Sequence, residues 1–194
     1  MARWLKKTYE QLFEDGSGQM KVSRGKVHDY LGMTLDFTVL GEVKITMFDY
    51  IESMVKDWLA YDDTSTTSTT PAAEHLFRVD PDATRLAEKE AKVFHNFVAR
   101  ALFLTKRARP DIHTAVAFTT TRVREPNRDD WKKLVRMMRY LRGTPELPLI
   151  CRADGTNIVK WWVNASHAVH PNMRGHTGGT LSLGKGSMVN ASTK

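Results

Sequence analysis

The segment between residues 100 and 142 concentrates side chains that can bind an anion. It holds twelve lysines and arginines against four acidic residues, an excess larger than the net charge of +7 carried by all 194 residues. Positive helices suit a phosphate backbone, which proteins contact in a sequence-independent and salt-sensitive way. A solvated helix face is the alternative for each helix taken alone. The residues predicted to contact nucleic acid here are Lys106, Arg107, Arg109, Lys132, Lys133, Arg136 and Arg139.

Paired carboxylates can hold magnesium, and the sequence offers two such pairs. Asp62 and Asp63 open a polar stretch rich in serine and threonine, whereas a metal pair needs a rigid and mostly buried support. Asp129 and Asp130 precede an amphipathic stretch, where acidic residues favour the N-terminus of a helix. Neither pair is therefore predicted to bind a metal ion.

Histidine, cysteine and glycine motifs do not predict a catalytic site either. His167, His170 and His176 have no nearby cysteine or acidic residue, so surface or loop-packing roles are expected rather than a zinc site. Cys151 is the only cysteine, which excludes an intrachain disulfide. The glycines between residues 175 and 186 lack the Lys-Ser/Thr ending of a phosphate loop and are expected to serve turns.

Apolar periodicity predicts the helices that position the charged residues. The repeat from Met47 to Leu59 has the spacing of a helix buried along one face. Lys132, Arg136 and Arg139 fall opposite the apolar stripe of their helix, so they can present charge together. The predicted helices span residues 4–14, 47–59, 83–105, 111–122 and 129–142.

Short alternating segments predict strands before and after these helices. Residues 31–37 and 42–46 predict a β-hairpin, and short strands are expected at 147–152, 158–164, 179–183 and 187–190. A solvated linker is expected at 62–71. We therefore predict an α+β fold whose last sheet has an uncovered face and looks truncated.

The sequence gives no sign of a membrane or secretory segment. No window approaches 18 uninterrupted apolar residues, and Trp4, Lys6 and Lys7 occupy the place where a signal peptide needs an apolar run. We expect an intracellular protein, cytoplasmic or nuclear, with no membrane partner.

Several motifs, in order, resemble those of copia-type LTR retrotransposon reverse transcriptases. "YLGM" at 30–33 resembles the step after the polymerase active site, and "MFDYIESMVKDW" at 47–58 resembles the first thumb helix. "TTPAAEHLF" at 69–77 resembles the Thr-Pro linker of the family. The most specific pair is "RPDI" at 109–112, within "KRARPDIHTAVAF", followed by "RYLRGT" at 139–144, within "DDWKKLVRMMRYLRGT". "KWWVNASHAVHPNMRGHTGGTLSLGKGS" at 160–187 resembles the opening strands of the linked RNase H domain.

The resemblance implies a role for each part of the chain. Residues 1–46 would be a palm remnant, with a primer-grip-like hairpin at Tyr30, Leu31 and Gly32 that holds the primer terminus. Residues 47–145 would be a helical thumb that grips the template-primer backbone, and residues 146–194 an incomplete, truncated RNase H-like sheet. An ordinary hairpin core is the alternative for residues 30–32.

The resemblance also implies that the chemistry lies elsewhere. The family's Tyr-x-Asp-Asp metal motif would precede this chain, and Asn164 stands where the family's RNase H domain has its first metal-binding aspartate. No cofactor is expected here, and magnesium is expected only in the complete polymerase with its missing palm and fingers.

The function predicted from the sequence is binding of an RNA/DNA or DNA duplex, as a non-catalytic fragment of an RNA-directed DNA polymerase. One alternative is a domesticated or regulatory nucleic-acid-binding protein derived from such an element. Another is a non-catalytic scaffold that self-associates through an exposed sheet edge.

Overall fold

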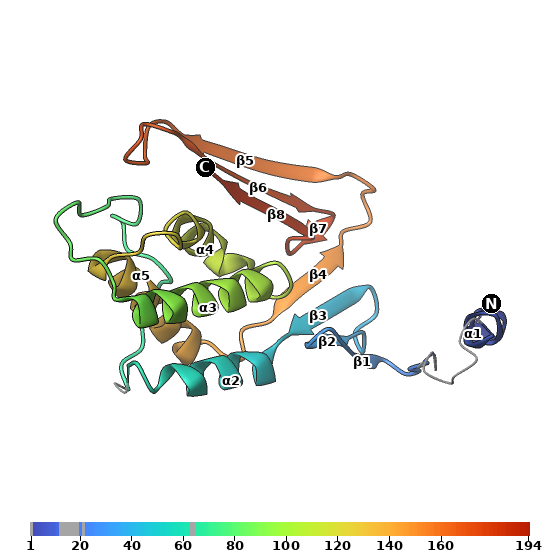
Figure 1. Cartoon of the computed structure of the whole chain (residues 1–194). Helices are drawn as coiled ribbons and strands as arrows, with labels where there is room; N and C mark the ends of the chain where they lie inside the picture. The colour runs from blue at the N-terminus through green and yellow to red at the C-terminus, as the bar shows by residue number, and fades with distance from the viewer. Residues whose placement is uncertain (1, 12–19, 21, 63–64) are drawn as a thin grey trace.

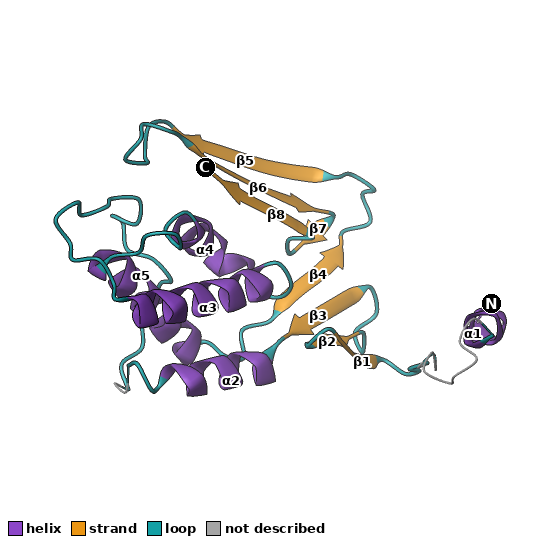
Figure 2. Ribbon diagram, in the orientation of Figure 1, coloured by secondary structure: helices purple, strands orange, loops and turns teal. Residues whose placement is uncertain are grey.

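The computed structural model describes residues 2–11, 20, 22–62 and 65–194 of the chain. Over these residues the fold is mixed α+β, as the sequence predicts, with α2 to α5 grouped beside two antiparallel sheets and α1 lying apart from both (Figures 1 and 2). The helices are α1 (Ala2–Glu10), α2 (Phe48–Trp58), α3 (Glu88–Thr105), the 3₁₀ helix η1 (Pro110–Ile112), α4 (His113–Thr120) and α5 (Arg128–Gly143). The strands are β1 (Val27–Tyr30), β2 (Met33–Asp36), β3 (Glu42–Thr46), β4 (Leu149–Ala153), β5 (Lys160–Ser166), β6 (His176–Ser182), β7 (Gly184–Lys185) and β8 (Val189–Thr193).

One sheet combines strands that precede the helices α2 to α5 with strands that follow them. Its strand order is β1-β2-β3-β4-β7, and β3 pairs with β4 so that Val43 lies opposite Cys151 and Ile45 opposite Leu149. The second sheet has the order β5-β6-β8. Segments predicted as a palm remnant and as RNase H-like strands therefore share the larger sheet, and the division of the chain at residues 46 and 145 stays a prediction.

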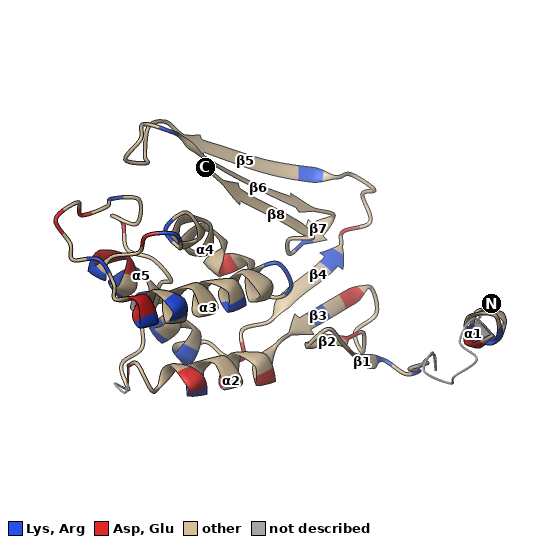
Figure 3. Cartoon of the chain, in the orientation of Figure 1, with Lys and Arg blue, Asp and Glu red and all other residues tan. Residues whose placement is uncertain are grey.

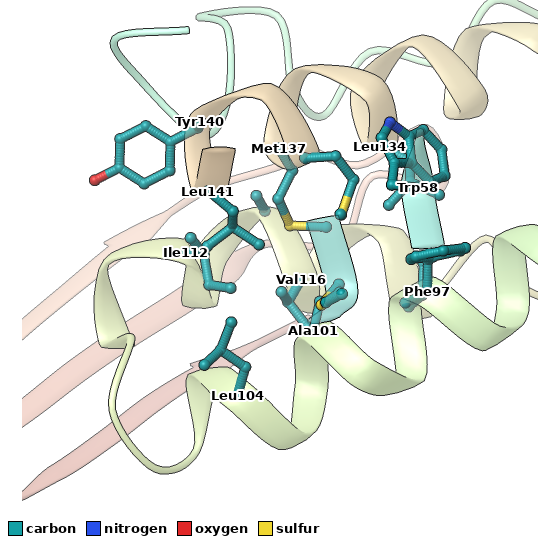
Figure 4. Close-up of a cluster of buried hydrophobic side chains, with 14 of the residues drawn as sticks. Trp58, Phe97, Ala101, Leu104, Ile112, Val116, Leu134, Met137, Tyr140 and Leu141 are labelled. Carbon is teal, nitrogen blue, oxygen red and sulfur yellow. The ribbon is translucent and has the colours of Figure 1, made fainter. Parts of the chain in front are cut away.

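The helices enclose a core centred on Trp58. This side chain is fully buried at the end of α2, with its ring 4.8 Å from that of Phe97 on α3 and 5.3 Å from that of Trp131 on α5. Figure 4 shows Trp58, Phe97, Leu134 and Met137 gathered between the same three helices. Truncating a buried aromatic side chain of this size costs about 3 to 5 kcal/mol. The apolar stripes of α2 and α5 are thus the faces that bury this core, as their periodicity predicts.

The start of α3 departs from the sequence prediction. The helix begins at Glu88 rather than near residue 83, because the preceding residues pair with the segment that leads into α5. Leu86 donates its backbone N–H to the carbonyl of Pro126 (3.0 Å), and Arg128 donates to that of Thr84 (2.9 Å). The helix start is then closed by Glu90, whose carboxylate accepts from the backbone N–H of Ala87 (3.2 Å).

A reciprocal cap fixes the start of α5. The backbone N–H of Asp130 donates to the side chain of Asn127 (2.9 Å), and the N–H of Asn127 donates to the Asp130 carboxylate (3.0 Å). Arg122 adds an ion pair to the same buried carboxylate at 3.0 Å. Asp130 is therefore a helix-capping residue, as the sequence predicts, and it satisfies N–H groups that a helix N-terminus leaves unpaired.

Arg109 is the most deeply buried basic side chain among the described residues. Its side chain is 1% exposed, and its guanidinium binds Asp111 through Nε (3.0 Å) and Nη2 (2.8 Å). The remaining donors reach Thr144, at its carbonyl (2.7 Å) and its hydroxyl (2.8 Å). The Tyr140 hydroxyl donates to the same Asp111 carboxylate (2.8 Å). The turn before α4 is thereby fastened to the end of α5.

These four residues come from the two most specific sequence motifs. Arg109 and Asp111 belong to "RPDI", whereas Tyr140 and Thr144 belong to "RYLRGT". Contact of Arg109 with nucleic acid stays a prediction, and it would require this buried guanidinium to leave its partners within the protein.

Replacing Arg109 by methionine is expected to lower the free energy of unfolding by about 3 to 5 kcal/mol, because the Asp111 carboxylate loses its charged partner. Urea denaturation followed by circular dichroism measures the loss. The control is Arg124→Met, at an exposed arginine of the same segment, where a change within about 0.5 kcal/mol is expected. Equal effects of the two substitutions would show that the buried network does not stabilise the fold.

Candidate nucleic-acid interface

The fold neutralises half of the predicted cationic surface. Among the described residues, six of the twelve cations between residues 100 and 142 form ion pairs, and three of the acidic partners come from outside that segment. Figure 3 shows acidic and basic residues interspersed along the ribbon of these helices. The pairs are Arg100–Asp57, Arg109–Asp111, Arg122–Asp130, Arg128–Glu90, Lys133–Asp129 and Arg139–Asp62.

Besides Arg109, two more of the predicted contact residues have carboxylate partners. Arg139 donates to both oxygens of the Asp62 carboxylate, at 2.9 and 3.0 Å, and so ties α5 to the chain after α2. Lys133 binds Asp129 (2.7 Å) and also donates to the backbone carbonyl of Arg78. Asp62 serves this ion pair, while Asp63 lies outside the described residues. Contact of Arg139 and Lys133 with nucleic acid stays a prediction, and it would have to compete with these partners.

Lys132 and Arg136 form a patch that keeps more of its charge available. Neither has a carboxylate partner among the described ion pairs, and Lys132 is exposed. Arg136 donates from Nη2 to the hydroxyl of Thr70 at 2.9 Å. We call these two residues the Lys132 patch; they line a cavity of about 210 Å³ between α5 and residues 72–76.

The predicted linker at 62–71 is solvated in part but also packs on α5. Most of its described side chains are exposed, as predicted. Ser68 nevertheless donates its backbone N–H to the carbonyl of Arg139 (3.4 Å). A Cβ atom added to Gly143 would lie only 3.1 Å from the Cβ of Thr67. The segment thus follows the helix that carries the Lys132 patch.

Lys106 and Arg107 lie beyond the last residue of α3, whereas the Lys132 patch lies on α5. Arg128, one turn before Lys132, is paired with Glu90 in the first turn of α3. With a rise of 1.5 Å per residue, the sixteen residues from 90 to 106 span about 24 Å. One continuous cationic cradle stays a prediction, and the cations that it would need lie on different elements.

The predicted primer-grip residues occupy a hairpin tip rather than the interior of a strand. Tyr30 pairs with Met33, and the two residues between them, Leu31 (φ 51°) and Gly32 (φ 76°), form the turn. Two successive positive φ angles match the tight turns that usually carry Asn-Gly. Leu31 is 56% exposed and has a backbone conformation that disfavours leucine. The hairpin turn is therefore strained, and it places an apolar side chain at the surface.

A buried histidine pair joins the smaller sheet to the helices. His170 Nε2 lies 3.1 Å from His176 Nδ1, and His176 Nε2 lies 2.7 Å from the Ser192 hydroxyl. Their rings contact Phe77 and that of His170 also stacks on Phe118 of α4. Burial lowers the pKa of both histidines below the ordinary value of 6.5. They pack in the interior, while His167 is exposed.

The part of the chain that the structure describes contains no candidate metal site. No group of three His, Cys, Asp or Glu residues there is arranged to hold a metal ion. Asn164 lies on β5 opposite Gly178, with its side chain exposed. Within the described residues, no helix has the length and apolar character needed to cross a membrane.

Comparison with known proteins gives one distant relative. The chain is 25% identical over 170 residues to a putative transposon Ty5-1 protein of Saccharomyces cerevisiae, a match that covers 88% of the chain and 54% of the relative. The chain thus spans about half the length of this relative. No family model and no solved structure matches. The similarity supports a transposon-derived protein.

Replacing Leu31 by asparagine is expected to raise the free energy of unfolding by about 1 kcal/mol, because asparagine tolerates the left-handed conformation that leucine resists. Urea denaturation measures the gain. Leu40→Asn is the control, since Leu40 is 97% exposed and does not have a positive φ. A loss of stability in Leu31→Asn alone would contradict the strain and assign Leu31 a packing role.

The histidine pair should make the fold sensitive to acid. Histidines with a lowered pKa take up fewer protons when folded than when unfolded, so stability is complete above about pH 6.5 and falls as the pH decreases toward their folded-state pKa values. Thermal denaturation between about pH 7.5 and pH 5 measures this loss. It should shrink in a double variant, His170→Gln with His176→Gln, and persist in His167→Gln. A wild-type melting temperature that does not change over this range would contradict the mechanism.

Proposed function

We propose that the chain is a template-primer-binding part of a copia-type retrotransposon reverse transcriptase, non-catalytic by itself. The similarity to a transposon Ty5-1 protein supports the origin, and the ordered motifs support the enzyme class. The observation that supports a binding role is that several cations of residues 100–142 have no acidic partner in the described part of the fold. Lys106, Arg107, Arg124, Lys132 and Arg136 have no acidic partner among the described ion pairs, and all but Arg124 belong to the contact residues predicted from the sequence.

The spacing of these cations suits a long, evenly charged ligand. A strand of duplex nucleic acid carries a phosphate about every 3.4 Å of helix axis, so separate cationic groups can each meet a phosphate of one strand. Contacts of this kind position a duplex without reading its sequence. The exposed Tyr30 and Leu31 at the hairpin tip fit a third contact, made to the primer end through apolar and aromatic surface.

The proposal places the metal chemistry in other parts of the enzyme. Asn164 offers a neutral amide where the family has a carboxylate, and a neutral amide does not supply the charge that holds magnesium between two carboxylates. Asp62, the described member of the Asp62–Asp63 pair, is bound by Arg139. Magnesium would belong to the complete polymerase with its palm and fingers.

A scaffold that self-associates through a sheet edge is the second candidate. The strand β5 lies at the edge of its sheet, and its Trp161, Trp162 and Val163 are each more than half exposed. Edge strands with exposed apolar residues favour pairing with another chain. This candidate predicts concentration-dependent association, which sedimentation measures, and no binding to hybrid duplex even at low salt.

A domesticated binding protein would keep the same contacts as the polymerase fragment. Duplex binding therefore does not separate these two origins. The coding sequence on either side of the chain does: a continuous frame with the Tyr-x-Asp-Asp motif upstream supports the polymerase fragment.

Replacing both residues of the Lys132 patch by alanine is expected to weaken binding to an RNA–DNA hybrid duplex and to lower the slope of log K against log salt by about 1 to 2, since each phosphate contact contributes about 0.9. Fluorescence anisotropy at several salt concentrations measures both. The charge-matched control is Lys56→Ala with Lys89→Ala, two exposed lysines on α2 and α3. If both double variants lose affinity and slope equally, the patch has no specific role.

A further inference from the structure

A small cavity lies where the end of α3 meets the two sheets. Its volume is about 280 Å³, and Figure 1 shows the turn after α3 beside the end of β7. Lys106 and Arg107 line one side, and Ser187 and Asn190 line the other. No acidic side chain lines it. We call it the Lys106 pocket; nothing in the sequence motifs or in the comparison assigns it a ligand.

Two glycines hold the far wall of the pocket in place. A Cβ atom at Gly186 would lie 1.9 Å from the carbonyl oxygen of Ile150, and one at Gly184 would lie 2.5 Å from that of Arg152. Both glycines also have positive φ angles, 155° at Gly184 and 76° at Gly186. The β7 turn can therefore approach β4 closely only with glycine at these positions. This close approach fixes Ser187 opposite the end of α3.

The amide of Asn190 lines this space. Its Oδ1 lies 2.6 Å from the hydroxyl oxygen of Ser187 and 2.8 Å from that of Thr180, and these two hydroxyls also hydrogen-bond each other. One of the two hydroxyls therefore donates to Oδ1, which leaves the Nδ2 group for another acceptor. Among the described hydrogen bonds none uses this NH₂ group. Asn190 therefore supplies two N–H donors without adding a carboxylate.

The two cations complete a donor set for an anion. Lys106 is exposed and makes no ion pair among the described residues. The Arg107 guanidinium stacks 3.5 Å from the centre of the Phe103 ring and donates from Nη1 to the Phe103 carbonyl (3.1 Å). This contact holds the guanidinium plane while leaving its Nε and Nη2 donors for a ligand.

We propose that the Lys106 pocket binds a phosphoryl group of a nucleic-acid backbone. A phosphate offers several acceptor oxygens to donors that converge from different directions, and this donor set carries two positive charges. The carbonyl end of α3 opposes an anion weakly. Hydrogen bonds between charged groups are stronger than this opposition, so two cationic donors outweigh it.

This proposal rests on the proposed function and assigns one phosphate position of it to named groups. The same chemistry would admit free phosphate, so the test uses two probes: inorganic phosphate and an RNA–DNA hybrid duplex. The informative variants are Lys106→Ala and Asn190→Asp. Asn190→Asp keeps the oxygen that contacts the hydroxyls of Ser187 and Thr180. It replaces only the NH₂ group, by a second oxygen that carries negative charge.

In ¹H–¹⁵N spectra of the full chain, inorganic phosphate is expected to shift the side-chain amide signals of Asn190, and Lys106→Ala should abolish that shift. Against the duplex, each variant should bind at least about threefold more weakly, and Lys106→Ala should lower the salt slope by about 1. Lys89→Ala is the matched control, because it removes one exposed lysine of α3 at the opposite end of the helix. Circular dichroism and melting temperature verify that each variant is folded.

The outcomes separate the pocket from the wider function. A phosphate-induced shift of Asn190 without duplex binding keeps the phosphoryl site, identifies free phosphate as its source and rejects the template-primer role. If the duplex binds and Lys106→Ala and Asn190→Asp weaken binding no more than Lys89→Ala does, the phosphoryl site in the pocket is rejected. The rest of the proposed function then remains. No shift with phosphate and no effect on the duplex overturns the pocket under either source.

Discussion

The arrangement of the helices depends on one buried guanidinium, that of Arg109. Arg109 can be buried only if Asp111 neutralises it and Thr144 accepts its remaining hydrogen bonds. That requirement fixes the end of α5 against the turn that starts α4, and the chain leaves this junction directly into β4. Because β4 pairs with β3, the same contact also sets how the helices stand against the larger sheet. A buried pair of this kind specifies an arrangement more than it adds stability.

The same logic explains why charge counted along the sequence overestimates the binding surface. Within residues 100–142 the cations outnumber the acidic residues, but folding brings Asp57, Asp62 and Glu90 into contact with them from outside that segment. Each of these ion pairs joins two elements that are far apart in sequence. Charge that holds helices together is not available to a partner, so the argument for binding must rest on the cations that the fold leaves without a carboxylate.

The parts of the fold that could be predicted are those with a local cause. The stripes of α2 and α5 are visible because burial along one face imposes a 3.6-residue period. The start of α3 could not be predicted, since the backbone of residues 84–86 pairs with that of residues 126–128 instead of continuing the helix. Two further features depend on residues far apart in sequence: the pairing of β3 with β4 and the contact of His170 with Phe77. The tight turn at Leu31 has a strained backbone that the residue types do not predict. For the candidate site, the residue types were predictable but their partners were not.

The motifs that carry the resemblance turn out to be structural, and this changes what the resemblance supports. "RPDI" and "RYLRGT" meet in the Arg109 network, and the glycine of the second motif allows Thr67 to lie against α5. Sequences that share these motifs are constrained to share this junction, which is an argument for a common fold rather than for a common ligand. A duplex-binding role must therefore be argued from Lys106, Arg107 and the Lys132 patch, residues whose charge the fold does not use. Their position on different elements, after the end of α3 and on α5, is what would let the chain hold a duplex at more than one phosphate.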